Sequence, residues 1–91
     1  MEISERELKQ QARDLLDIKG VFNYPLQQGL GSYRGLPDKV MHLNEKVCYL
    51  EFKVRKNKLS IYQQAFQAQC QADNIPYFVI RNIEELMEII G

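Results

Sequence analysis

The spacing of apolar residues predicts a helix over residues 4–19, at the start of the chain. The apolar positions recur at i, i+4, i+7 and i+8, which places them on one face of a helix. They are Leu8, Ala12, Leu15 and Leu16. The Ser-x-x-Glu spacing of Ser4 and Glu7 is typical of a capping box at a helix start, and Gly20 is a natural stop.

Two further helices are predicted in the second half of the chain. The first covers residues 60–73, where positions at i, i+4, i+7 and i+11 are expected to face inward. These positions are Ile61, Ala65, Ala68 and Ala72. The second begins at Asn82, whose Asn-x-x-Glu relation to Glu85 is a capping signal. Its expected buried residues are Ile83, Leu86, Met87 and Ile90.

Three strands are predicted between the first two helices. Residues 21–26 are typical of a short strand that lies at a sheet edge or ends early, because Pro25 lacks a backbone donor. Residues 39–43 and 47–54 flank a turn-prone segment and predict a β-hairpin. In the second strand of this hairpin, the period of two separates an apolar face from a mixed face. The apolar face carries Cys48, Leu50, Phe52 and Val54, and the other carries Val47, Tyr49, Glu51 and Lys53.

A fourth strand, residues 76–81, is apolar on both faces and is therefore expected in the interior of the sheet. Because a helix joins it to the strand at 47–54, the two should run parallel through a right-handed crossover. The glycine-rich stretch 27–37 shows no period and predicts a flexible loop. The predicted order α-β-β-β-α-β-α describes one domain over residues 1–91, an α/β (α+β) fold with a mixed sheet flanked by helices.

Composition narrows the class of protein. The 91 residues are 45% hydrophobic and 26% charged, which suits a globular domain rather than disorder. No apolar run reaches the roughly 18–20 residues of a membrane span, and the charged first residues are unlike a signal peptide. An intracellular protein with no membrane partner is therefore expected. Cys48 and Cys70 are expected to be buried reduced thiols rather than a disulfide or a metal site.

Asp38, Glu51 and Lys53 form the candidate chemical centre. Glu51 and Lys53 project from the same strand face because they are two residues apart. A turn centred on positions 44–45 places Asp38 opposite Glu51, and a turn centred on position 45 alone places it opposite Phe52. Either register brings two carboxylates together, where they repel unless a proton or a cation intervenes. Mg²⁺ prefers such oxygen ligands, and Lys53 could orient a water and stabilise developing phosphate charge. The plain alternative is a solvated strand pair with Asp38 as a turn residue.

Two polar residues near helix starts have two interpretations each. Glu5 lies on or beside the inward face of the first helix, where it either caps the first turn or points into a site. Ser60 and Gln63 form a Ser-x-x-Gln capping box, and Gln63 could also reach a water or a phosphate. The residues by themselves leave these alternatives open.

Five motifs together resemble the VRR-NUC domain, the virus-type replication-repair branch of the PD-(D/E)xK nucleases. They are Glu5, the GLPD of residues 35–38, the EFK of 51–53, the KLSxxQ of 58–63 and the VIRNIEE of 79–85. The D…ExK motif of Asp38, Glu51 and Lys53 is weak evidence alone, but together with the downstream LSxxQ the set of motifs is fairly specific. The resemblance covers nearly the whole chain. It implies a restriction-endonuclease-like core, which agrees with the element order, and a virus- or phage-encoded protein.

The resemblance also implies a role for each candidate residue. The catalytic set would be Glu5, Asp38, Glu51, Lys53 and Gln63. Within it, Asp38, Glu51 and the backbone carbonyl of Phe52 would bind the catalytic Mg²⁺, with Mn²⁺ as an alternative ion. Lys53 would activate or position the attacking water. Glu5 would add a further acidic group and a possible metal ligand, and Gln63 would support the site.

The net charge of zero hides a polarity along the chain. Residues 32–58 hold seven basic and three acidic residues, whereas the remainder holds five basic and nine acidic ones. Such a basic segment suits a phosphate backbone. Its candidate DNA contacts are Arg34, Arg55, Lys56 and Lys58. The plain alternative is that 55–58 is a solvated loop. The compact stretch 20–37 departs from the family's pattern and leaves Arg34 anchored to no motif.

These features predict a Mg²⁺-dependent, structure-specific DNA endonuclease. One site cuts one strand, so paired cuts across branched DNA need a symmetric homodimer. The resemblance implies four-way (Holliday) junctions as the substrate and DNA repair as the setting. Tyr62 and Phe66, which lie off the predicted inward stripe, are a candidate dimer surface, with ordinary core packing as the alternative. The rival function is a non-catalytic DNA-binding or assembly module that keeps the fold.

Overall fold

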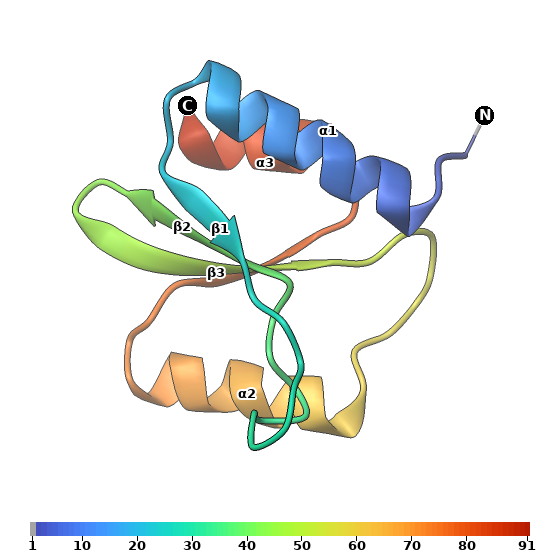
Figure 1. Cartoon of the computed structure of the whole chain (residues 1–91), viewed down its shortest axis with the longest axis vertical. Coiled ribbons are helices and arrows are strands. Elements are labelled where there is room, and N and C mark those ends of the chain that lie inside the picture. The colour runs from blue at the N-terminus through green and yellow to red at the C-terminus, as the bar shows by residue number, and fades with distance from the viewer. Residues whose placement is uncertain (1) are drawn as a thin grey trace.

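The computed structural model describes residues 2–91 as three layers, with a four-stranded sheet between helices (Figure 1). α1 (Glu5–Ile18) and α3 (Ile83–Ile90) lie over one face of the sheet, and α2 (Ile61–Ala72) lies over the other. The strands, in their order across the sheet, are β1 (Asn23–Pro25), β2 (Lys39–Leu43), β3 (Lys46–Phe52) and β4 (Tyr77–Ile80). The predicted element order and the mixed α+β class are confirmed. Within residues 2–91, no helix is both long and apolar enough to cross a membrane.

Side-chain caps set the helix starts at the predicted positions. Ser4 Oγ accepts from the Glu7 amide at 3.1 Å, and Glu7 Oε1 accepts from the Ser4 amide at 3.1 Å, which completes the capping box of α1. Gly20, with φ of +71°, follows the end of this helix. At α3, Asn82 accepts from the Glu85 amide at 3.0 Å, as its spacing predicts.

The register of the hairpin is the first of the two predicted alternatives. Asn44 and Glu45 both have positive φ, 52° and 66°, as a type I′ turn requires. β2 and β3 pair antiparallel with Lys39 opposite Leu50, which sets Asp38 opposite Glu51 one position further. β1 is shorter than predicted but lies at the sheet edge, and β3 and β4 run parallel as expected.

Helix α2 turns a different face to the sheet from the predicted one. Ile61 is 72% exposed, and Ala65, Ala68 and Ala72 are exposed as well. The less exposed positions of α2 are Gln63, Phe66, Gln67 and Cys70. The ring of Phe66 packs against three tyrosine rings, with centroids at 5.0 to 6.0 Å: Tyr33, Tyr49 and Tyr77. One aromatic ring buries more apolar area than several alanines, so Phe66 sets the rotation of the helix.

Three further expectations are corrected by the packing. Phe66 does not share an outer surface with Tyr62, because its ring faces the sheet, so the alternative of core packing holds for it. β4 is an edge strand rather than an interior one, and helices over both faces of the sheet explain its apolar character. In α3, Met87 is 50% exposed, and Ile89 packs against the core instead.

The main core lies between α1, α3 and the sheet. It contains Leu8, Ala12, Leu16, Met41, Cys48, Leu50, Phe52, Val54, Ile80 and Leu86. The predicted apolar faces of α1 and β3 are therefore confirmed. Cys48 and Cys70 are buried free thiols, as expected. Because the side chains of β3 alternate, this core anchors the strand while Glu51 projects to the opposite side, toward α2.

Candidate functional site

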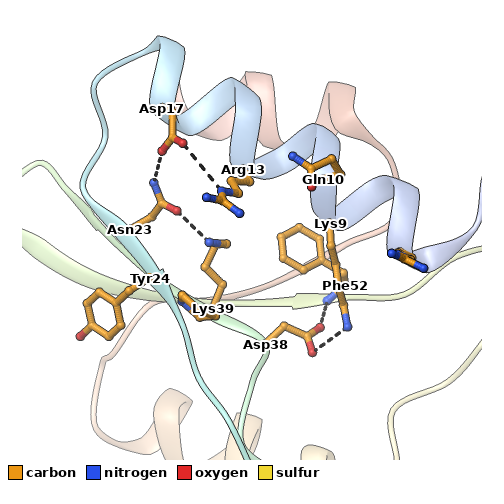
Figure 2. Close-up of a pocket in the computed structure, with 11 residues that line it drawn as sticks. Lys9, Gln10, Arg13, Asp17, Asn23, Tyr24, Asp38, Lys39 and Phe52 are labelled. Atoms are coloured by element: carbon orange, nitrogen blue, oxygen red, sulfur yellow. Dashed lines mark hydrogen bonds and ion pairs between the residues drawn. The ribbon is translucent and has the colours of Figure 1, made fainter.

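Asp38 and Glu51 meet where the hairpin leaves the sheet, at the end away from its turn. The Asp38 amide donates to the Leu50 carbonyl at 3.0 Å, which extends the β2–β3 ladder to this residue. Asp38 Oδ2 in turn accepts from the Phe52 amide at 2.8 Å (Figure 2). Backbone pairing and this side-chain bond together hold the Asp38 carboxylate beside β3.

Glu51 is a buried carboxylate with one free oxygen. It is only 2% exposed, and its Oε2 accepts from Gln63 Nε2 at 3.2 Å. Its Oε1 is buried and has no hydrogen-bond partner within residues 2–91. Burial raises the pKa of Glu51 to about 8, with help from the charge of the adjacent Asp38, while the charge of Lys53 opposes the shift. The interpretation of Glu51 as a solvated surface residue is therefore wrong.

Gln63 fills the capping role that its spacing predicts and also contacts Glu51, while its reach to a water or a phosphate stays a prediction. Its side chain and that of Ser60 form a complete capping box, with distances of 2.9 and 3.1 Å. The same amide donates to Glu51. The cap fixes the first turn of α2, so Gln63 Nε2 is held in place to orient the buried carboxylate.

Glu5 reaches the site through a lysine. Lys9 Nζ lies 3.4 Å from Glu5 Oε2 and 3.3 Å from Asp38 Oδ1, so it bridges the two carboxylates (Figure 2 shows the contact with Asp38). Burial lowers the pKa of Lys9, but the charges of Asp38 and Glu5 outweigh that effect and leave the pKa raised. The bridge was missed in the sequence, although the i, i+4 spacing of Glu5 and Lys9 is a signal for such a pair.

The predicted basic residues divide into anchored and free side chains. Arg34 Nη1 donates to the Tyr62 hydroxyl at 2.9 Å, and its guanidinium lies over the Tyr62 ring at 4.9 Å, so the 27–37 loop is tied to α2 after all. Arg55 pairs with Glu2 at 2.7 Å. Lys56 and Lys58 are exposed and form no ion pair with any residue in 2–91.

No protein-family model matches the chain, and no curated protein matches it either. A solved structure described as a VRR_NUC domain matches with a TM-score of 0.81 and 18% sequence identity, over 94% of this chain and 92% of that one. The chain has the fold of a VRR_NUC domain. The resemblance found in the sequence motifs is confirmed at the level of the fold.

Within this VRR_NUC fold, the donor set at Asp38 and Glu51 fits a hard divalent cation. The unpartnered Glu51 Oε1 is a buried acceptor, and the Asp38 carboxylate lies next to it. Residues 2–91 contain no group of three or more His, Cys, Asp or Glu side chains placed to hold a metal ion. The ligands from the protein would be the two carboxylates and the Phe52 carbonyl. Mg²⁺ suits such a small set, because it keeps several waters and needs only one or two carboxylates.

Two further residues, to which the sequence analysis gave no role, contact or lie beside β3 and the loop that follows it. The Tyr77 hydroxyl is buried without a partner in residues 2–91, and burial together with the charge of Glu51 raises its pKa. Arg81 Nη1 donates to the carbonyls of Arg55 and Asn57 at 3.2 and 2.9 Å, which clamps the loop after β3. No periodicity could have identified either residue, because both depend on how β4 pairs with β3.

Gly35 lets the loop before Asp38 pack directly on the start of α2. A Cβ atom at this position would lie 2.2 Å from the Tyr62 carbonyl oxygen and 2.8 Å from the Gln63 amide nitrogen, both in the backbone. We expect Gly35→Ala to lower the free energy of unfolding by about 1–3 kcal/mol, since overpacking forces the backbone to shift.

Thermal unfolding followed by circular dichroism checks this prediction. The expected loss is a fall of roughly 4–20 °C in melting temperature for a domain of this size. Gly29→Ala is the matched control, because a Cβ at Gly29 meets nothing within 4 Å. Equal melting temperatures for the two variants would contradict the close packing of Gly35 on α2.

Proposed function

We propose that the protein is a Mg²⁺-dependent, structure-specific DNA endonuclease that hydrolyses phosphodiester bonds. The observation that carries this proposal is the buried Glu51 carboxylate beside Asp38, with one oxygen lacking a partner within residues 2–91. Two adjacent carboxylates of this kind are costly to ionise unless a cation joins them. The VRR_NUC fold of the chain supports nuclease chemistry at this pair.

The residues around the pair have separate parts in such a reaction. Mg²⁺, when bound, would polarise the phosphate and lower the pKa of water. Asp38 and Glu51 hold the charge of the ion, and the Gln63 amide fixes Glu51 in one orientation. Lys53, two residues along the same strand face, positions the attacking water and stabilises the charge that develops on the phosphate. The water oxygen bonds to phosphorus and releases a proton to solvent, one phosphorus–oxygen bond breaks, and the departing sugar oxygen takes up a proton from solvent.

The proposed substrate is branched DNA, such as a four-way (Holliday) junction, cut by a homodimer. The exposed Lys56 and Lys58 next to the site suit contacts with the phosphate backbone rather than with bases. Each chain offers one carboxylate pair, so two symmetric cuts need two chains. DNA repair is the corresponding setting.

Cleavage of labelled DNA tests the proposal. Four-way, flap and linear DNA of the same sequence content are incubated with the protein in Mg²⁺, in Mn²⁺ and in chelator. We expect Mg²⁺-dependent cutting of the four-way junction, at least about tenfold faster than cutting of linear duplex, with paired nicks in opposite strands. Sedimentation should show two chains on each junction. Binding without cutting in either metal would instead support the non-catalytic DNA-binding or assembly module.

A further inference from the structure

A pocket of about 510 Å³ lies between α1 and the β1–β2 pair, next to the proposed metal site but separate from Glu51 (Figure 2). It begins at Asp38 and Phe52 and continues along α1 toward β1. Most of the residues that line it are of polar or charged type, and they include four basic and two acidic ones. The basic ones are Arg6, Lys9, Arg13 and Lys39. Its volume is in the range of pockets that bind small molecules.

Lys39 is a buried cation in this pocket. The residue is only 7% exposed, and its Nζ donates to Asn23 Oδ1 at 2.7 Å. No carboxylate of residues 2–91 forms an ion pair with it. A buried ammonium without an ion-pair partner is costly, so an anion that enters the pocket would offset part of this cost.

Helix α1 supplies the other cations from one side. Arg6, Lys9 and Arg13 follow one another at spacings of three and four residues, which places them on one helix face. Arg13 contacts Asp17 only at 4.0 Å, with both side chains well exposed, so its charge remains largely available. Arg6 forms no ion pair within residues 2–91. Lys9 is already paired with Glu5 and Asp38, so Arg6 and Arg13 are the α1 cations whose charge remains available beside the buried Lys39. Such a set is suited to an anion with several oxygens.

We infer that this pocket binds a phosphate group of the nucleic acid strand, next to the phosphate at the Asp38–Glu51 pair. The inference rests on the proposed function, because the pocket opens at Asp38, where that function places the bond to be cut. Lys39, held by Asn23, and Arg13 contact the bound phosphate. Their role is to bind and register the strand, so they are not catalytic residues.

Binding of labelled single-stranded oligothymidylate in chelator tests the inference without any need for cleavage. The variants are Lys39→Met, which keeps the buried stem, and Arg13→Gln, which changes an exposed side chain. Lys46→Met is the matched control, because Lys46 is exposed and lies five residues along β3 from Glu51, about 17 Å away. Fluorescence anisotropy measures the dissociation constant over a range of salt, and circular dichroism confirms folding.

We expect Lys39→Met to weaken binding about tenfold, since the variant loses a charge-assisted hydrogen bond to the phosphate. Arg13→Gln should weaken it at least threefold. Each lost phosphate contact should also flatten the salt dependence by about 0.7 in log–log slope. Tighter binding of 5′-phosphorylated strands than of 5′-hydroxyl strands would identify a terminal phosphate as the bound group. Equal binding would identify a phosphate within the strand.

The inference fails if both variants match Lys46→Met in affinity and in salt slope. An inactive wild-type protein that nevertheless shows the Lys39 effect would overturn the nuclease proposal and leave the phosphate pocket standing. Normal cleavage, with no effect of Lys39→Met or Arg13→Gln on binding, would overturn the phosphate pocket and leave the nuclease proposal standing. The two conclusions can therefore fail separately.

Discussion

Replacing Glu51 by Gln is expected to stabilise the metal-free protein at pH 8 and, at the same time, to abolish metal-dependent cleavage. Glu51 is 2% exposed and lies beside Asp38, and its pKa is raised to about 8. Glutamine keeps the shape of the side chain and can still accept from Gln63, but it has no charge to bury. Without the second carboxylate the cation is held poorly, and we expect cleavage to fall by about a thousandfold or more.

The sign of the pH dependence follows from the raised pKa. Between its ordinary pKa of 4.5 and about 8, Glu51 holds a proton in the folded state that it loses in the unfolded state. The contribution of Glu51 to the free energy of unfolding is therefore fully present below pH 4.5 and is lost as the pH rises through 8. One pKa unit corresponds to about 1.4 kcal/mol. The free energy of unfolding of Glu51→Gln should therefore exceed that of the wild type by at least about 2 kcal/mol at pH 8. That gain corresponds to an increase of roughly 10 °C in melting temperature.

Melting temperatures in chelator between pH 5 and pH 9 measure this difference. The wild type should lose stability across the interval, and Glu51→Gln should show a flatter profile. Glu88→Gln is the control, because Glu88 is exposed on α3 and should leave the profile unchanged. Added Mg²⁺ should raise the melting temperature of the wild type at pH 8 and leave that of Glu51→Gln almost unchanged. Parallel pH profiles for wild type and Glu51→Gln would show that Glu51 is not a buried ionisable group.

Local signals were enough to predict the elements and the central pair of carboxylates. The capping boxes at Ser4 and Ser60 set two helix starts in the structure as they do in the sequence. The alternation in residues 47–54 assigned Glu51 to the face opposite the core, and both possible turns brought Asp38 close to it. These features depend on spacing within a few residues or across one hairpin, where backbone geometry leaves few alternatives.

The rotation of α2 and the surroundings of the site depend on contacts that spacing does not encode. The alanine stripe of α2 and the side that contains Phe66 are both compatible with a buried face, and the tyrosines of the sheet and the 27–37 loop decide between them. The burial of Lys39 depends on β1 and α1 meeting over β2. The pairing of Lys9 with Asp38 joins residues 29 positions apart, so only the packed fold brings them together.

Replacing Lys53 by Met should give a protein that folds and binds DNA but does not cut it. Lys53 is half-buried beside Glu51, and its charge is close enough to lower the pKa of that carboxyl. Methionine keeps most of the aliphatic stem and removes only the ammonium. If Lys53 positions the attacking water and stabilises the phosphate charge, the cleavage rate should fall by about 10²–10⁴-fold. DNA affinity in chelator should change by less than about threefold, because this charge acts on the reacting group.

The same variant makes an independent prediction for the metal-free protein. Loss of the Lys53 charge removes a favourable charge that opposes the raised pKa of Glu51, so the pH at which stability is lost should move upward. Lys46→Met, on the same strand, should change neither the cleavage rate nor this pH. A Lys53→Met protein that shows the upward shift but cuts normally would leave Lys53 as an electrostatic neighbour of Glu51 and exclude it from catalysis. Loss of cleavage together with the shift places the ammonium at the reacting phosphate, since a purely structural role would lower stability at every pH.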